Sequence, residues 1–140
     1  MKLTIPSKSV NEGFARSAVA AFSLELNPSL DEINDIKTAV SEAVTNCIVH
    51  AYPNNENGEI IIESTIEDNS IHISVSDYGL GIEDIEKALQ PFYSTRSSEE
   101  RSGMGFTVMQ TFMDEVKVFS APNDGTKIEM CKKISVSEND

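Results

Sequence analysis

The 140-residue sequence contains no tryptophan, only two cysteines, and only 11 lysine or arginine residues against 23 aspartate or glutamate residues. The resulting formal net charge of −12 would repel a nucleic-acid backbone or an anionic membrane surface, so neither is expected as a direct partner. No hydrophobic run approaches the length of a membrane-spanning helix, and the first residues contain no apolar core of a secretory signal. We therefore expect a cytoplasmic protein.

The two cysteines, Cys47 and Cys131, fall on a predicted apolar helix face and in an alternating segment near the C-terminus. Two unlinked thiols in a reducing compartment are the simplest interpretation. A chain of this length buries about 70% of the surface that it exposes when unfolded, so neither disulfides nor a metal are needed for folding. We expect a single domain over residues 1–140, with a polar tail at about 135–140.

The first part of the chain predicts a short strand and two helices. The strand covers residues 2–5, and the helices run from about residue 9 to 26 and from about residue 29 to 52. In the second helix, apolar residues recur at the helical period and form one broad face. Glu42 and Asn46, four positions apart, lie on one line just outside that face. A carboxylate and a carboxamide there can serve a pocket at the rim of the core.

Two pairs of alternating strands are predicted after the helices. The first pair surrounds a turn at residues 67–70, and the second surrounds a turn at residues 122–125. In the first pair, Asp77 shares the face of the apolar residues and so points toward the core. An unpaired buried charge is costly, so we expect hydrogen-bond donors close to this carboxylate. Thr126 shares the apolar face of the last strand and can meet Asp77 across the sheet.

Residues 82–102 are polar and irregular, and they are interpreted as a mobile lid, since a segment of this kind inside a compact domain is functional or disordered. Gly103 and Gly105 then open a further helix. Gly79 and Gly81 follow Asp77 at a turn where the backbone comes close to a neighbour or takes a positive φ.

Each of these features has a role in nucleotide binding. A core-facing carboxylate at Asp77 accepts a hydrogen bond from the exocyclic amine of adenine, whereas guanine places a carbonyl oxygen against it. Gly103 and Gly105 let backbone N–H groups approach phosphates. Asn46 offers an oxygen ligand suited to Mg²⁺, which bridges phosphate oxygens.

In this order along the chain, the features resemble the nucleotide-binding boxes of the GHKL ATPase superfamily, which includes gyrase-type ATPases and histidine kinases. The resemblance implies an α/β fold of the Bergerat type, a two-layer sandwich in which helices cover one face of a mixed, mostly antiparallel sheet and ATP lies between the layers. The four matching segments are Glu42 to Asn46, Asp77 to Gly81, Arg101 to Phe106, and Gly125 with Thr126.

Within the superfamily, the segments SEAVTN, PFYSTR, ERSGMGF and FMDEV closely resemble the sporulation anti-sigma-F factors of endospore-forming bacteria. Members of that family hold a sigma factor inactive as a dimer and phosphorylate a serine on an anti-anti-sigma protein. The resemblance implies that Glu42 is the base for the serine proton and Asn46 the Mg²⁺ ligand. It also implies that Asp77 contacts adenine and Arg101 contacts phosphate from the lid.

The same resemblance implies a homodimer and a role for the N-terminal helix in meeting partners, with Glu12 and Arg16 as candidates. The chain departs from the family pattern at Ala51, where a glycine is expected. Two other functions remain open from the residues alone. One is an ATP-gated binding module that transfers no phosphate, and the other is a detached catalytic piece of a histidine kinase, which the lack of a preceding phosphoacceptor helix disfavours.

Overall fold

The structure is a computed structural model that describes residues 1–82, 85, 89 and 105–135. Arg101, Gly103, most of the predicted lid and the tail from residue 136 lie outside the described residues. The described strands form one sheet with the order β1-β2-β3-β5-β4. The elements are β1 (Lys2–Pro6), α1 (Val10–Ser23), η1 (Leu24–Leu26), α2 (Leu30–Asn46), η2 (Cys47–Ala51), β2 (Glu59–Glu67), β3 (Ser70–Asp77), α4 (Gly105–Phe112), β4 (Glu115–Ser120) and β5 (Thr126–Lys133).

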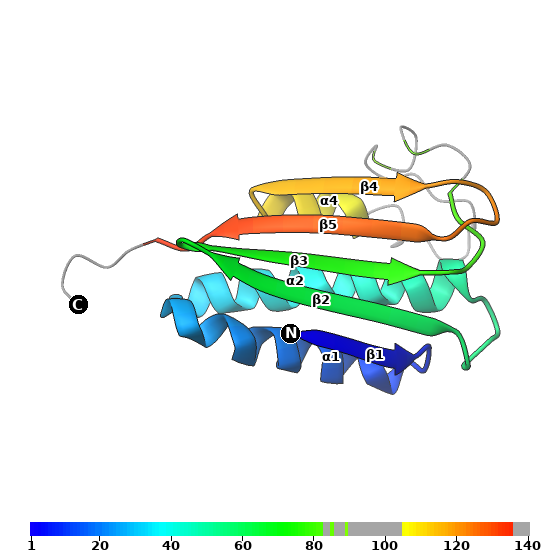
Figure 1. Cartoon of the computed structure of the whole chain (residues 1–140), viewed down its shortest axis with the longest axis horizontal. Coiled ribbons are helices and arrows are strands. Elements are labelled where there is room, and N and C mark those ends of the chain that lie inside the picture. Colours follow the sequence, from blue (N-terminus) through cyan, green and yellow to red (C-terminus); the bar gives the residue numbers. More distant parts are fainter. Residues whose placement is uncertain (83–84, 86–88, 90–104, 136–140) are drawn as a thin grey trace.

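The helices α1, α2 and α4 lie on one side of the five-stranded sheet, as Figure 1 shows. This arrangement confirms the predicted two-layer α/β sandwich. Every pairing between the described strands is antiparallel, so the parallel component expected of a mixed sheet does not occur in this part of the chain. None of the described helices is long and apolar enough to cross a bilayer.

The core lies between the two layers. Its residues recur at the helical period on α2 and at every second position on the strands. On α2, Ile36, Val40 and Val44 are fully buried at helical spacing. On the sheet, Ile60 and Val75 are fully buried at alternating positions. Burial of one side chain of this kind stabilises the fold by about 1.5–3 kcal/mol, so the matched periods hold α2 against the central strands.

The start of α2 is set by a capping box. The N-cap is Ser29. Its side chain accepts from the backbone N–H of Glu32 at 3.1 Å, and the Glu32 carboxylate accepts from the Ser29 backbone N–H at 2.8 Å. These bonds pair two N–H groups that the first helical turn leaves without partners.

The end of α2 differs from the sequence prediction of a regular helix to residue 52. The α-helix ends at Asn46, and the next five residues form the π-helical turn η2. The backbone N–H of Tyr52 donates to the carbonyl oxygen of Cys47, five residues earlier, at 3.0 Å. Wider turns of this kind are common near functional sites.

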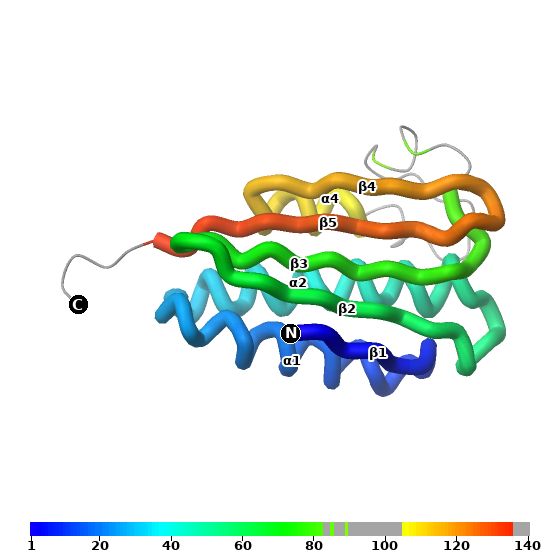
Figure 2. The backbone as a smooth tube through the Cα atoms, viewed as in Figure 1, coloured from blue at the N-terminus to red at the C-terminus, as the bar shows by residue number. Residues whose placement is uncertain are grey.

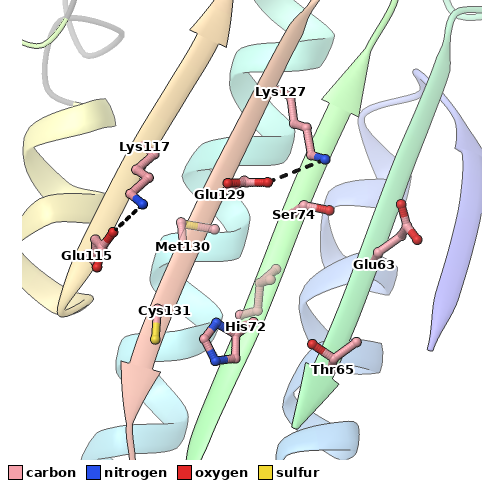
Figure 3. Close-up of a pocket in the computed structure, with 11 residues that line it drawn as sticks. Glu63, Thr65, His72, Ser74, Glu115, Lys117, Lys127, Glu129, Met130 and Cys131 are labelled. Atoms are coloured by element: carbon pink, nitrogen blue, oxygen red, sulfur yellow. Dashed lines mark ion pairs between the residues drawn. The ribbon is translucent and has the colours of Figure 1, made fainter. Parts of the chain in front are cut away.

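The other face of the sheet is polar, and none of the described helices covers it. Figure 3 shows the residues that line a pocket there, with ion pairs from Lys117 to Glu115 (2.9 Å) and from Lys127 to Glu129 (3.4 Å). His72 lies on this face, as its strand phase predicts. Among the described residues, the groups predicted to bind nucleotide are on the helical side or at the end of the sheet.

Candidate functional site

Asp77 is the last residue of β3, and it is only 6% exposed. It is paired in register with Ile60 of β2 and Thr126 of β5. One carboxylate oxygen, Oδ1, accepts from the backbone N–H of Gly79 at 2.9 Å and from that of Thr126 at 3.2 Å. The structure therefore confirms the inward orientation of Asp77, the donors that it needs, and its pairing with Thr126.

The buried Cys47 thiol also hydrogen-bonds the Asp77 carboxylate. Burial raises the pKa of Asp77, and the hydrogen bonds from Gly79, Cys47 and Thr126 oppose that rise. Burial and the negative charge of Asp77 hold the pKa of Cys47 well above its usual range. Cys47 therefore remains a neutral thiol that donates to the carboxylate.

Gly79 and Gly81 shape the turn after Asp77. A Cβ on Gly79 would collide with the carbonyl group of Ala51 at the end of η2. Gly81 has a φ of +75°, and a Cβ there would collide with the carbonyl oxygen of Ala121. Both glycines are required because backbone approaches from both sides of the turn.

The turn is held between two other segments of the chain. On one side, the backbone N–H of Leu80 donates to the carbonyl oxygen of Ala51 at 3.2 Å. On the other, the backbone N–H of Gly125 donates to the carbonyl oxygen of Gly79 at 3.2 Å. Figure 2 shows the end of β3, the loop after η2 and the β4–β5 turn at the same end of the molecule.

Glu42, Asn46 and Gly105 come together where α4 begins beside α2. A Cβ on Gly105 would lie 3.2 Å from Oδ1 of Asn46 and 3.5 Å from a carboxylate oxygen of Glu42. A larger side chain at Gly105 would fill this space. Gly105, from the third predicted segment, is thus adjacent to the first, although a long stretch of chain separates them.

Two buried polar groups, one on α2 and one on α4, find no hydrogen-bond partner among the described residues. They are Nδ2 of Asn46 and the hydroxyl of Thr107, which lies in the first turn of α4. Buried polar atoms in proteins are nearly always paired, so unpaired ones need a physical explanation. Asn46 lies beside Glu42 and Gly105, so its unpaired Nδ2 indicates a site for a polar ligand there.

Glu12 and Arg16 lie on α1 and form an ion pair at 3.1 Å. Glu12 also accepts a hydrogen bond from the hydroxyl of Ser41 at 2.8 Å. Ser41 directly precedes Glu42 on α2. The structure therefore ties this candidate partner-binding pair to the helix that carries the predicted base.

The sequence assigned no role at the site to four residues of these segments, namely Cys47, Tyr52, Thr107 and Ser120. Ser120 accepts from the backbone N–H of Ile82 at 2.8 Å and donates to the carbonyl oxygen of Gly125 at 2.8 Å. Its oxygen also lies 2.8 Å from the hydroxyl of Thr126. Sequence patterns give no signal for such contacts, because they depend on how distant segments meet.

Comparison with known proteins adds to this geometry. Residues 5–132 match the family model of the histidine kinase-like ATPase domain. The chain is 61% identical over 134 residues to a protein of Caldanaerobacter subterraneus named anti-sigma F factor, covering 96% of this chain and 93% of the relative. It is 54% identical over 136 residues to a protein of the same name from Clostridium beijerinckii, covering 97% and 95%.

A solved structure shows the same fold at low sequence identity. It contains the RsbU and RsbW domains of Rv1364c from Mycobacterium tuberculosis, and it superposes with a TM-score of 0.70 at 18% identity. The match covers 98% of the present chain and 33% of the solved one. The fold of the whole chain is therefore one that occurs in an experimental structure.

Proposed function

This chain belongs to the histidine kinase-like ATPase family and, within it, to the anti-sigma F factors, and on that premise we propose that it is an ATP-dependent protein serine kinase. It binds and inhibits a sporulation sigma factor, and it phosphorylates a serine of an anti-anti-sigma protein. The observation that best supports phosphoryl transfer is the meeting of Glu42, Asn46 and Gly105 at one place. Membership of an ATPase family implies that the chain binds ATP.

Asp77 binds the adenine base in this proposal. Its carboxylate accepts from the exocyclic amine of adenine, while the backbone N–H groups of Gly79 and Thr126 hold it in place. Guanine would present a carbonyl oxygen to the same carboxylate, and two acceptors facing each other cost about 1–3 kcal/mol. The close-fitting turn of Gly79 and Gly81 keeps Asp77 at a fixed position.

Asn46 holds Mg²⁺ in this proposal. Its amide oxygen is a ligand type that Mg²⁺ accepts. Nδ2 of the same amide is buried with no partner among the described residues, which supports a polar ligand at this place. Mg²⁺, when bound, neutralises charge on the phosphates. Gly105 keeps the space beside Asn46 open, and Arg101 and Gly103, which lie outside the described residues, are proposed to contact the phosphates.

Glu42 is the base in this proposal. The serine oxygen of the partner attacks the γ-phosphorus of ATP, and the proton of that hydroxyl passes to the Glu42 carboxylate. The bond between the γ-phosphorus and the bridging oxygen breaks, and ADP leaves with the electron pair. Phosphoryl transfer needs mainly alignment and charge neutralisation, which a rigid helix that carries both Glu42 and Asn46 provides.

The partners are a sigma factor and an anti-anti-sigma protein, and the chain acts as a homodimer in the cytoplasm. Glu12 and Arg16 on α1 are proposed to contact a partner. The Glu12 side chain is 27% exposed and that of Arg16 is 42% exposed, so both are accessible. A partner that engages Glu12 would compete with the hydroxyl of Ser41, the residue next to Glu42.

The test is incubation of the purified chain with Mg²⁺, γ-labelled ATP and the anti-anti-sigma protein. We expect acid-stable, base-labile label on a serine of that protein and none on the present chain. Label on a histidine of this chain would instead support a histidine kinase fragment. Tight ATP binding with no label on either protein would contradict the kinase proposal and support an ATP-gated binding module.

A further inference from the structure

Tyr52 joins the end of the α2–η2 helix to the turn that follows Asp77. Its hydroxyl accepts from the backbone N–H of Tyr78 at 2.7 Å. The same hydroxyl donates to the carbonyl oxygen of Glu59, the first residue of β2, at 2.7 Å. One side-chain oxygen therefore fixes the backbone directly after Asp77 relative to the neighbouring strand.

The Tyr52 ring is itself held in place. A Cβ on Gly58 would collide with three carbon atoms of that ring, so the glycine backbone packs directly against it. At its other end, the Tyr52 backbone N–H donates to the Cys47 carbonyl oxygen and closes the π-helical turn. The ring position and the backbone position together determine where the hydroxyl lies.

Two hydrogen bonds thus connect the turn after Asp77 to the end of the α2–η2 helix. The first is the Tyr52 hydroxyl to the Tyr78 N–H, and the second is the Ala51 carbonyl to the Leu80 N–H at 3.2 Å. Asn46 directly precedes η2, and Cys47, the first residue of η2, hydrogen-bonds Asp77. The adenine-binding turn and the helix of the predicted metal ligand are therefore linked by six consecutive residues, Cys47 to Tyr52.

We propose that the Tyr52 hydroxyl is a positioning group for base recognition: it fixes the turn so that the Asp77 carboxylate meets the adenine amine. This inference rests on the proposed ATP site. Tyr52 does not touch the reacting atoms, so its loss affects the affinity for ATP and the choice between ATP and GTP. It does not affect the rate of phosphoryl transfer at saturating ATP.

The test is Tyr52→Phe, which removes the hydroxyl and keeps the ring that packs on Gly58. The loss of one hydrogen-bonding group predicts about a three- to tenfold weaker affinity for ATP. The affinity for GTP, which does not use the Asp77 acceptor in the same way, changes less than about twofold. Titration calorimetry with each nucleotide measures both affinities, and the maximal rate of phosphoryl transfer stays within about twofold.

Ser7→Ala is the matched control. The Ser7 hydroxyl donates to the carbonyl oxygen of Asn55 at 2.6 Å and accepts from the backbone N–H of Gly58 at 2.9 Å. The Ser7 hydroxyl therefore donates once and accepts once, as the Tyr52 hydroxyl does, and its partners lie in the loop before β2. It makes no bond to the turn after Asp77. Ser7→Ala lowers the unfolding temperature as Tyr52→Phe does and leaves the ATP-to-GTP affinity ratio unchanged.

Three outcomes separate the possible failures. An unchanged ATP-to-GTP affinity ratio in Tyr52→Phe would overturn the inference. Equal loss of that ratio in Ser7→Ala would overturn it as well, because general loosening of the loop would then explain the effect. No binding of ATP by the unmodified protein would overturn the proposed function itself, which is a different result.

Discussion

The two ends of the candidate site differ in how completely their polar groups are paired. At the proposed adenine end, Asp77 has two backbone donors and the Cys47 thiol, and the turn is packed against neighbours on both sides. At the proposed phosphate end, Nδ2 of Asn46 has no partner among the described residues, and neither has the Thr107 hydroxyl on α4. The adenine end is therefore formed by the chain alone, while the phosphate end has polar groups left for a ligand.

This difference implies a division of tasks. An end held by the chain's own hydrogen bonds suits base selection, because selection needs an acceptor that does not move to suit guanine. The phosphate end carries the groups proposed for transfer. Mutations at the two ends should therefore change different measured quantities, namely nucleotide choice and the rate of transfer.

The largest expected effect is at the phosphate end. Glu42→Gln removes the proposed base and keeps the shape of the side chain. The maximal rate of serine phosphorylation should fall by about 10²- to 10⁴-fold, the usual contribution of a general base. The affinity for ATP, measured by titration calorimetry, should stay within about threefold. A variant that transfers phosphate at the normal rate would remove Glu42 from the mechanism.

The second effect is at the adenine end. Asp77→Asn replaces one carboxylate oxygen, which accepts hydrogen bonds, with an amide nitrogen, which donates them. The side chain is then a poorer partner for the exocyclic amine of adenine. The affinity for ATP should fall by about 5- to 150-fold, corresponding to 1–3 kcal/mol, and the preference over GTP should decrease. Nucleotide titration that shows neither change would contradict the adenine assignment.

A pair of hydroxyl deletions compares the stability of the two ends. Ser120→Ala removes a hydroxyl that bonds Ile82 and Gly125 at the adenine end, and should lower the free energy of unfolding by about 1–3 kcal/mol. Thr107→Val removes a buried hydroxyl that has no partner among the described residues, and should change it by less than about 0.5 kcal/mol. Urea denaturation measures both.

The affinities for ATP and GTP provide a second test of the Thr107→Val variant. If the Thr107 hydroxyl serves the phosphates, Thr107→Val should weaken ATP and GTP equally, by about three- to tenfold. An equally large loss of stability in the two variants would show that the ends do not differ in pairing. Unchanged affinity for both nucleotides in Thr107→Val would place that hydroxyl outside the phosphate site.

The smallest effect is the dependence of base choice on pH. Burial raises the pKa of Asp77 above its usual 3.8, so the carboxylate becomes protonated at a higher pH than an exposed aspartate. The protonated group is a poorer acceptor for the adenine amine. The ATP-to-GTP affinity ratio should therefore decrease as pH falls through that raised pKa, and it should be constant well above it. The ratio cancels the titration of the phosphates, which both nucleotides share.

Asp77→Asn is the control for this pH dependence, because an asparagine does not titrate. Its ATP-to-GTP ratio should stay flat over the same range of pH. A ratio that still decreases in the variant would assign the effect to another group. The thiol of Cys47 is not such a group in this range, since its pKa lies well above the usual value and it stays neutral.

The sequence predicts the inner face of the sheet and the inner edge of the helix well. Asp77 and Thr126 follow from alternation, since a period of two leaves only two orientations for a side chain. The positions of Glu42 and Asn46 follow equally from the helical period. These elements obey local rules that a single sequence carries.

The remaining parts of the site depend on contacts between distant segments. The π-helical turn from Cys47 replaces a predicted regular helix, and the Tyr52 hydroxyl bonds the backbone of β2 and of the turn after β3. Neither leaves a periodic signal in the sequence. The meeting of Gly105 with Asn46 was expected only from a family resemblance, and coordinates are needed to show it.

The separation of base choice from phosphoryl transfer is tested most directly by the saturation kinetics of serine phosphorylation with ATP and with GTP. We predict a half-saturating concentration about 5- to 150-fold higher for GTP, from the mismatch at Asp77, with a maximal rate within about twofold of that with ATP. Equal half-saturating concentrations with a much lower maximal rate for GTP would contradict the account.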